Sequence, residues 1–297
     1  MKVLIAIDSS PASERLTDEA VARPWPPRSS FCVVNAVDVN LFAELPALIA
    51  DARREGERIV EAGAAKLAGA GHAVECRVVS GSPRRAISAF AGQWGAELIL
   101  VGSHGRGAVG RFLIGSVAQG ILRKAHCSVE IVRTRPAEPA PSTHALKILV
   151  SSDGSECSLA AARSVASRPW PEGTVFQIIS VQELVVMDTP IGAGSLAAIY
   201  PASLLEELMA DARAQAKAGV ESAKVILAQA GLKMTEPPLI PVGDPRINIL
   251  DAAKAWRADL IVLGSHGRRG LDRILMGSVS EAVAVHAGCS VEVIRTV

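Results

Sequence analysis

A glycine- and serine-rich motif occurs twice in the chain, each time directly after a short apolar run. The first has GSHG at 102–105 and GS at 115–116, and the second has GSHG at 264–267 and GS at 277–278. A glycine after a strand lets a ligand approach the backbone closely. A Gly-Ser step at a helix start presents free N–H groups, a hydroxyl and the positive end of the helix dipole to an anion. The spacing therefore predicts a phosphate-binding site in each copy.

Charged side chains near the two motifs fit the same chemistry. Arg106 and Arg111, matched by Arg268 and Arg273, are placed to close over phosphates. Asp8 and Asp153 each follow an apolar run and are candidates for ligand contact. As aspartates they are also good caps for the helices behind them, and capping does not exclude ligand contact.

Other motifs and roles are less well supported. The chain has no Gly-Lys dipeptide, which excludes a P-loop lysine. G-x-G-x-x-G at 105–110 is broken in the second copy, so we treat this match to a dinucleotide motif as accidental. Neither His104 nor His266 has a carboxylate or a nucleophile at a sequence spacing that is typical of a catalytic site. For these histidines, loop hydrogen bonding is a simpler role than catalysis.

The chain repeats itself, and the repeat predicts two domains. KVLIAID at 2–8 matches KILVSSD at 147–153 with an offset of 145, and AELILVGSHGR at 96–106 matches ADLIVLGSHGR at 258–268 with an offset of 162. The second copy therefore has 17 extra residues (162 minus 145). We expect a first domain at 1–134, a Pro-rich linker at 135–145 and a second domain at 146–297. The insert is placed at about 184–203, as a flexible or short-helical flap near the second site.

Strand and helix signals alternate within each copy. In the first copy they predict strands at 2–7, 31–37, 74–79, 97–101 and 128–133, and helices at 11–22, 45–68, from Pro83, and at about 116–125. Continuous apolar runs are typical of buried parallel strands. The alternation predicts an α/β fold of two tandem doubly wound parallel sheets with helices on both faces. Ligands of such sheets bind at the carboxyl ends of the strands, where both motifs lie.

Composition excludes several classes of partner. The 297 residues carry 31 Lys and Arg against 30 Asp and Glu, and only 3% are aromatic, so neither nucleic acid nor an anionic membrane is expected as a partner. No apolar run approaches the length of a membrane span, and the start MKVLIAID resembles a strand more than a signal peptide. The five cysteines form no C-x-x-C pair, which favours reduced thiols in a cytoplasmic protein.

The G-x2-G-x9-G-S spacing after the fourth strand, with an aspartate ending the first, resembles the universal stress protein superfamily. Both copies carry it, so the chain resembles a tandem member. The resemblance implies an adenine nucleotide alpha hydrolase-like, Rossmann-like fold that binds ATP, with Mg²⁺ as a candidate companion. It also implies site residues at these positions: Asp8 and Asp153 against the nucleotide; Ala36 and Val181 beside the adenine; Gly102, Gly105, Gly115, Ser116 and Val117, with Gly264, Gly267, Gly277, Ser278 and Val279, on the phosphate side. Asn35 and Ser180 depart from the family, which commonly has a histidine there.

The resemblance further implies a cytoplasmic regulatory or sensing module in the stress response, with two ATP per chain. Its two domains would associate through their last strands within one chain, and a homodimer is the alternative. A rival function is slow ATP hydrolysis or phosphoryl transfer, with Asp8 and Asp153 holding Mg²⁺. A third is binding of another adenine nucleotide. The chain contains no G-x-S-x-G and no H-E-x-x-H, and no water-positioning base is obvious, which counts against fast turnover.

Overall fold

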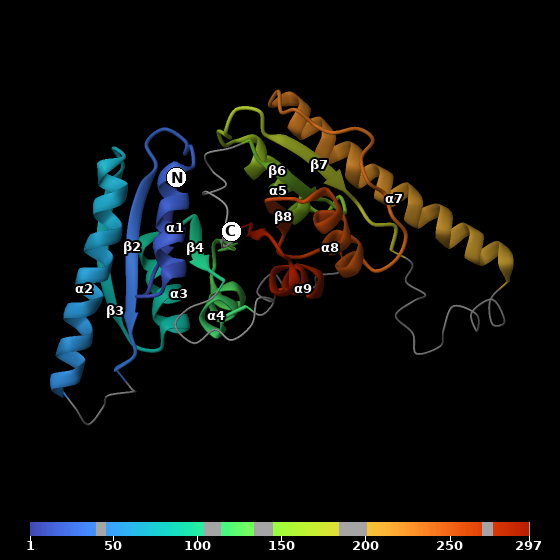
Figure 1. Cartoon of the computed structure of the whole chain (residues 1–297). Coiled ribbons are helices and arrows are strands. Elements are labelled where there is room, and N and C mark those ends of the chain that lie inside the picture. The colour runs from blue at the N-terminus through green and yellow to red at the C-terminus, as the bar shows by residue number, and fades with distance from the viewer. Residues whose placement is uncertain (40–45, 104–113, 134–144, 184–200, 269–275, 297) are drawn as a thin grey trace.

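Both copies of the repeat contribute strands to one nine-stranded sheet. The computed structural model describes residues 1–39, 46–103, 114–133, 145–183, 201–268 and 276–296 (Figure 1). The first copy supplies β1 (Lys2–Ala6), β2 (Ser30–Val37), β3 (Ala73–Ser80), β4 (Leu98–Gly102) and β5 (Ser128–Val132). The second supplies β6 (Lys147–Ser151), β7 (Val175–Ile179), β8 (Leu260–Gly264) and β9 (Ser290–Ile294). The strand order is β3-β2-β1-β4-β5-β9-β8-β6-β7, which confirms the predicted α/β fold.

The two copies meet where β5 pairs with β9. This pairing is antiparallel, whereas every other neighbouring pair of named strands is parallel. Glu130 lies opposite Glu292, its own equivalent at the offset of 162. The two copies are therefore related by a pseudo-twofold axis between these residues. We call this junction, with its flanking helices, the seam.

Helices cover both faces of the sheet. On one face lie α1 (Pro11–Ala22) and α2 (Pro46–Gly69) in the first copy, and α5 (Glu156–Ala166) and α7 (Ala202–Gln229) in the second. On the other lie α3 (Pro83–Trp94), α4 (Ser116–Lys124), α8 (Pro245–Trp256) and α9 (Ser278–His286). Proline opens α1, α3 and α8, where its fixed φ suits a first turn that needs no N–H donor.

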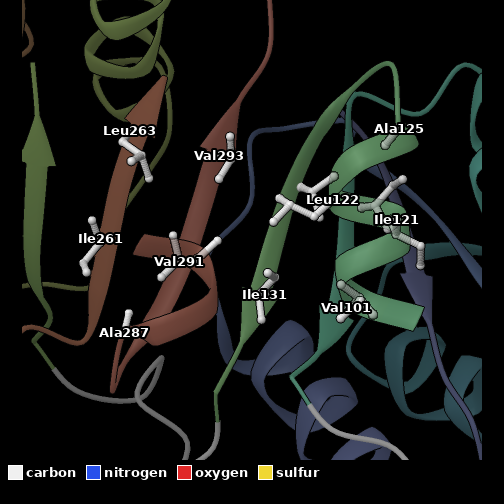
Figure 2. Packing of buried hydrophobic residues seen from close by; sticks show 14 of the residues in the cluster. Val101, Ile121, Leu122, Ala125, Ile131, Ile261, Leu263, Ala287, Val291 and Val293 are labelled. Atoms are coloured by element: carbon white, nitrogen blue, oxygen red, sulfur yellow. The ribbon is translucent and has the colours of Figure 1, made fainter. Parts of the chain in front are cut away.

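The core on the α3–α4–α8–α9 face runs without a break across the seam. Ile131 of β5 and Val291 and Val293 of β9 belong to this one cluster, together with Ile121 and Leu122 of α4 (Figure 2). All five side chains are fully buried. Burial of a side chain of this size stabilises the fold by roughly 1.5–3 kcal/mol. The other face has two separate clusters, one under α1 and α2 and one under α5 and α7.

The outer edge of the sheet differs between the copies. β3 pairs with β2 over eight residues, whereas the corresponding stretch of the second copy makes three isolated parallel bridges to residues at Phe176, Ile179 and Gln182. This stretch contains Pro237, Pro238 and Pro241. Proline has no N–H to donate to a ladder, so a continuous strand is not formed.

The predicted insert and the predicted linker lie mostly outside the described residues. Most of the predicted insert, 184–200, lies outside the described residues, and α7 already begins at Ala202. The linker is likewise described only at Ala145. Within the part of the chain that the structure describes, no helix is long and apolar enough to cross a membrane.

Candidate functional site

The second copy brings Asp153 and the GSHGR loop together at the carboxyl ends of two neighbouring strands. Asp153 follows β6 and Arg268 follows β8, and these strands are paired in parallel. The backbone N–H of Arg268 donates to Asp153 Oδ2 at 3.1 Å, and that of Ser155 donates to Oδ1 at 2.9 Å. Both carboxylate oxygens are thus held by backbone donors from two different loops.

Two glycines of the motif are required by this packing. A Cβ on Gly267 would lie 2.8 Å from Asp153 Oδ2, so any larger residue would push the loop away from the carboxylate. A Cβ on Gly264 would lie 2.6 Å from the backbone carbon of Cys157 at the start of α5. Gly264 therefore lets the backbones of β8 and α5 approach each other, and Gly267 lets its loop approach the Asp153 carboxylate.

The electrostatics of Asp153 favour its charged form. Burial by itself raises the pKa of a carboxyl, but hydrogen bonds from Ser155, Ser158 and the Arg268 backbone outweigh it and lower the pKa of Asp153 below its ordinary value of 3.8. Asp153 therefore remains a carboxylate at neutral pH, partly buried at the carboxyl ends of the strands.

The start of α9 faces the same edge of the sheet. Gly277 is the N-cap of α9, and its N–H donates to Ser265 O at 2.9 Å. A Cβ on Gly277 would lie 2.9 Å from that oxygen, although its φ of −68° is one that any residue can adopt. Ser280 Oγ also donates to Ser265 O, at 2.8 Å. Glycine is thus required at 277 by the close approach of the backbone.

The first copy repeats this arrangement at α4. Gly115 is the N-cap, has a φ of −65° and donates from its N–H to Ser103 O at 2.7 Å. A glycine cap has no side chain that can accept from the N–H groups of the first turn. Ser116 and Val117, like Ser278 and Val279, lie in this first turn. These donors and the helix dipole suit an anion, which is the fit that a nucleotide phosphate requires.

Asp8 organises the first-copy loop after β1. Its Oδ1 accepts from the N–H of Ser10 at 2.9 Å, from Ser10 Oγ at 2.5 Å and from Ser13 Oγ at 2.8 Å. Ser10, and not Asp8, is the N-cap of α1. The alternative that Asp8 is itself the helix cap is therefore wrong; its carboxylate fixes the turn that precedes the cap. Ser155 is likewise the N-cap of α5, two residues after Asp153.

The side chain of Arg268 is turned towards α7. Its Nη1 donates to Gln215 Oε1 at 2.7 Å. The same helix approaches the loop after β6, because a Cβ on Gly219 would lie 2.9 Å from the backbone carbon of Asp153. Sequence reasoning missed both contributions. The helix follows the insert, where the offset between the copies changes and pairwise matching fails.

His266 lies in this loop as a neutral side chain. Its Nδ1 is 2.9 Å from Ser265 Oγ, and burial together with the charge of Arg295 lowers its pKa. Ser103 and Ser265, whose carbonyls receive the glycine N–H groups, were also missed. Their signal was available, since the same GSHGR sequence occurs in both copies.

The other predicted site residues are placed as follows. Ala36 lies near the end of β2 and Val181 lies two residues after β7; both are half-buried against the core, as are Val117 and Val279. Gly102 ends β4. Gly105, Arg106, Arg111 and Arg273 lie outside the described residues. Among the residues that are described, no group of three or more His, Cys, Asp or Glu side chains could hold a metal ion.

The fold and this edge of the sheet define a tandem α/β protein of two doubly wound domains, each with an aspartate and a glycine-capped helix at the strand ends. The model of the universal stress protein family matches residues 1–133 and again 145–295. The chain therefore belongs to the universal stress protein family.

Individual relatives agree with this assignment. A universal stress protein of Mycobacterium tuberculosis is 32% identical over 202 residues, which are 65% of this chain and 59% of that protein. This chain thus spans less than two thirds of that relative. One from Synechocystis is 32% identical over 152 residues, 50% of this chain and 97% of that protein. The crystal structure of a universal stress protein from Archaeoglobus fulgidus, 20% identical, covers 99% of this chain and 96% of its own with a TM-score of 0.65, which shows the shared fold.

Proposed function

We propose that this protein binds ATP at the carboxyl ends of the strands, one molecule in each copy, and acts as a regulatory or sensing module. The observation that carries the proposal is the convergence of three features at one edge of the sheet. These are the ionised Asp153, the backbone of Gly267 and Arg268 held against it, and the glycine-capped start of α9. The first copy shares the aspartate and the glycine-capped helix.

Each part has a separate task in this proposal. The first-turn N–H groups of α4 and α9 hold the phosphates. Asp8 and Asp153 accept hydrogen bonds from hydroxyl groups of the nucleotide, and the backbone beside Ala36 and Val181 contacts the adenine. Arg268 exchanges its bond to Gln215 for the phosphates, which pairs a cation with the most highly charged part of the ligand.

Mg²⁺ is an optional part of the proposal. The ion usually keeps several waters and takes only one or two protein carboxylates besides the phosphates. Asp153 fits as one such carboxylate, although its two oxygens already accept backbone hydrogen bonds. Mg²⁺ would supply neutralisation of phosphate charge.

Binding and regulation are favoured over catalysis. His266 is turned to Ser265. Slow hydrolysis or phosphoryl transfer remains the alternative activity. We also propose that the protein works in the cytoplasm. Its two copies would act as an intramolecular pair, and the β5–β9 ladder supports this second proposal.

Mass spectrometry of ligand released from purified protein tests the proposal. We expect intact ATP, at up to two molecules per chain. Conversion of added ATP to ADP during incubation would favour the enzymatic alternative. Release of no nucleotide, together with no binding of added ATP, would contradict the proposed function.

A further inference from the structure

The helices at the seam differ between the copies in a complementary way. Gln119 and Glu281 are equivalent at the offset of 162, as are Arg123 and Val285. Gln119 Nε2 lies 3.3 Å from Glu281 Oε1, and Arg123 Nε donates to the same oxygen at 2.7 Å. A single carboxylate on α9 thus receives two donors from α4. We call these four residues the rim.

A second charged group lies on the opposite face of the sheet. Glu130 and Glu292 face each other and are fully buried. Arg23 donates to both oxygens of Glu130 at 2.6 Å, and Arg168 Nη2 donates to Glu292 at 2.8 Å. The first copy adds Glu19, also buried and bonded to Arg23 at 3.0 Å. Its equivalent at the offset of 145 is Ser164. We call this group the buried charge cluster.

Other contacts at the seam are made equally by each copy to the other. Arg133 donates to the carbonyls of Ala284 and Val285 at the end of α9, at 2.9 and 2.8 Å. Its equivalent Arg295 donates to Leu122 O near the end of α4, at 2.8 Å. Because each copy supplies the same arginine, these contacts would form equally well between any two copies. They stabilise pairing without selecting the partner.

The rim would oppose pairing of two second copies. The pseudo-twofold axis relates Gln119 to Glu281, so two second copies paired by the same geometry would place Glu281 against Glu281 at the distance now bridged by Gln119. Val285 would stand where Arg123 now neutralises the charge. Like charges in this position repel each other.

The buried charge cluster would oppose pairing of two first copies. Such a pair would bury Glu19 and Glu130 twice, which makes four carboxyl groups beside two guanidinium groups of Arg23. The observed pair has three carboxyl groups beside two guanidinium groups. Uncompensated charge is costly to bury, so the additional carboxyl group disfavours this pairing.

We propose that the rim and the buried charge cluster together select the partner at the seam, so that a first copy pairs with a second copy and not with its own kind. The occupant of each seam face is therefore the other half of the same chain. The linker already raises the effective concentration of this partner. The charges add discrimination against a second chain, which would otherwise offer the same strands and the same capping arginines.

Moving the rim charges from one copy to the other tests this directly. The first variant, Gln119→Glu with Arg123→Val, gives α4 the residues of α9, so that two carboxylates meet. The second variant adds Glu281→Gln and Val285→Arg, which restores the complementary set in mirror image. Hydrogen exchange of the β5 and β9 amides is followed in the full chain, with the β1 amides as the internal reference for an intact fold.

We expect β5 and β9 to exchange about fivefold faster than the parent in the first variant, as for loss of a well-placed surface pair. The mirror-image variant should return to the parent rate. Arg58→Glu is the control, because this side chain is exposed on α2 and far from the seam. It should not change the exchange rate of β5 or β9. If exchange of the β1 amides is also faster in the first variant, the single variants Arg123→Glu and Glu281→Arg are measured in its place. The double variant that carries both changes should then return to the parent exchange rate. The proposal would be overturned if the first variant exchanged at the parent rate. It would also be overturned if the mirror-image or double variant exchanged as fast as the variants that lack the complementary charges.

Discussion

At the scale of single residues, the charges of this protein are set by what surrounds them. Asp153 is partly buried but accepts backbone hydrogen bonds on both oxygens, and its pKa is lowered. Glu19 also has hydrogen bonds, yet deeper burial prevails and raises its pKa against the opposing charge of Arg23. The carboxyl of Asp153 stays charged at neutral pH, whereas that of Glu19 takes up a proton more readily. Their pH responses should therefore have opposite signs.

Asp153→Asn should make the fold less stable by about 1–3 kcal/mol at neutral pH, because its amide NH2 group would oppose a backbone donor. The lowered pKa means that the carboxylate contributes stability above its unfolded value near 3.8, and that this contribution is lost as the pH falls through the folded value. The difference between parent and variant should therefore be constant above about pH 5 and shrink below about pH 4. Urea unfolding across this range measures it. A difference that grows on acidification would contradict the account.

Glu19→Gln should be stabilising at alkaline pH, by about 1 kcal/mol, since it removes a buried charge and keeps the shape. A raised pKa means that stability is lost as the pH rises from the ordinary value of 4.5 through the folded value. The advantage of the variant should therefore grow with pH. Glu130→Gln is the contrasting change. It leaves Arg23 poorly paired and should cost about 3–5 kcal/mol. Thermal unfolding at pH 5 and pH 8 compares the two, and equal effects would show that Glu19 is not a strained charge.

At the scale of elements, strands and helices were far more predictable than the contacts between them. Each bound that was predicted for a first-copy element lies within one residue of the observed one. Most of the strands are short apolar runs, and proline opens α1 and α3. The broken edge of the second copy could have been inferred from its prolines. The role of the Arg-Pro-Trp-Pro sequence, which occurs at 23–26 and again at 168–171, could not be inferred. Its arginine reaches a buried glutamate in the last strand of the same copy. The guanidinium carbon lies 5.4 Å from the centre of the tryptophan ring in the first copy and 5.0 Å in the second.

The approach of α7 to the site gives a test at this scale. Gly219→Ala would place a Cβ 2.9 Å from the backbone at Asp153, so the helix must shift, at a cost of about 1–3 kcal/mol. Gly92→Ala in α3 is the matched control, because nothing lies within 4 Å of the added carbon. It should stabilise by up to about 1 kcal/mol through helix propensity. Urea unfolding measures both. Equal effects would show that α7 does not rest on the loop after β6.

The glycines of the motif were predicted as important positions, but for a different reason from the one that the structure shows. Their spacing predicted ligand contact, yet Gly264 and Gly277 are needed so that backbones can approach each other, and Gly267 so that its loop can approach the Asp153 carboxylate. Gly277→Val should therefore disturb the loop at Ser265 as well as any ligand. Asp153→Asn is the sharper probe of binding, since it preserves size. Asp8→Asn is its counterpart in the first copy.

At the scale of the whole molecule, two similar sites lie on one sheet, related by the pseudo-twofold axis at the seam. The repeat predicted this tandem arrangement, because the apolar strands and the motif recur in register. The differences between the copies arise from the insert before α7, the prolines beside β7 and single exchanges such as Glu19 for Ser164. The insert and the prolines could be read from the sequence, whereas the consequence of single exchanges for the contacts between the copies could not. The two sites are thus expected to share a ligand and to differ in affinity.

Calorimetric titration of nucleotide-stripped protein with ATP tests the central claim most directly. The account predicts two molecules per chain. One should remain in Asp153→Asn and one in Asp8→Asn. Failure of the parent to bind ATP would contradict the account at its centre. A single parental site that both variants leave unchanged would show that the aspartates and glycines serve only the packing of their loops.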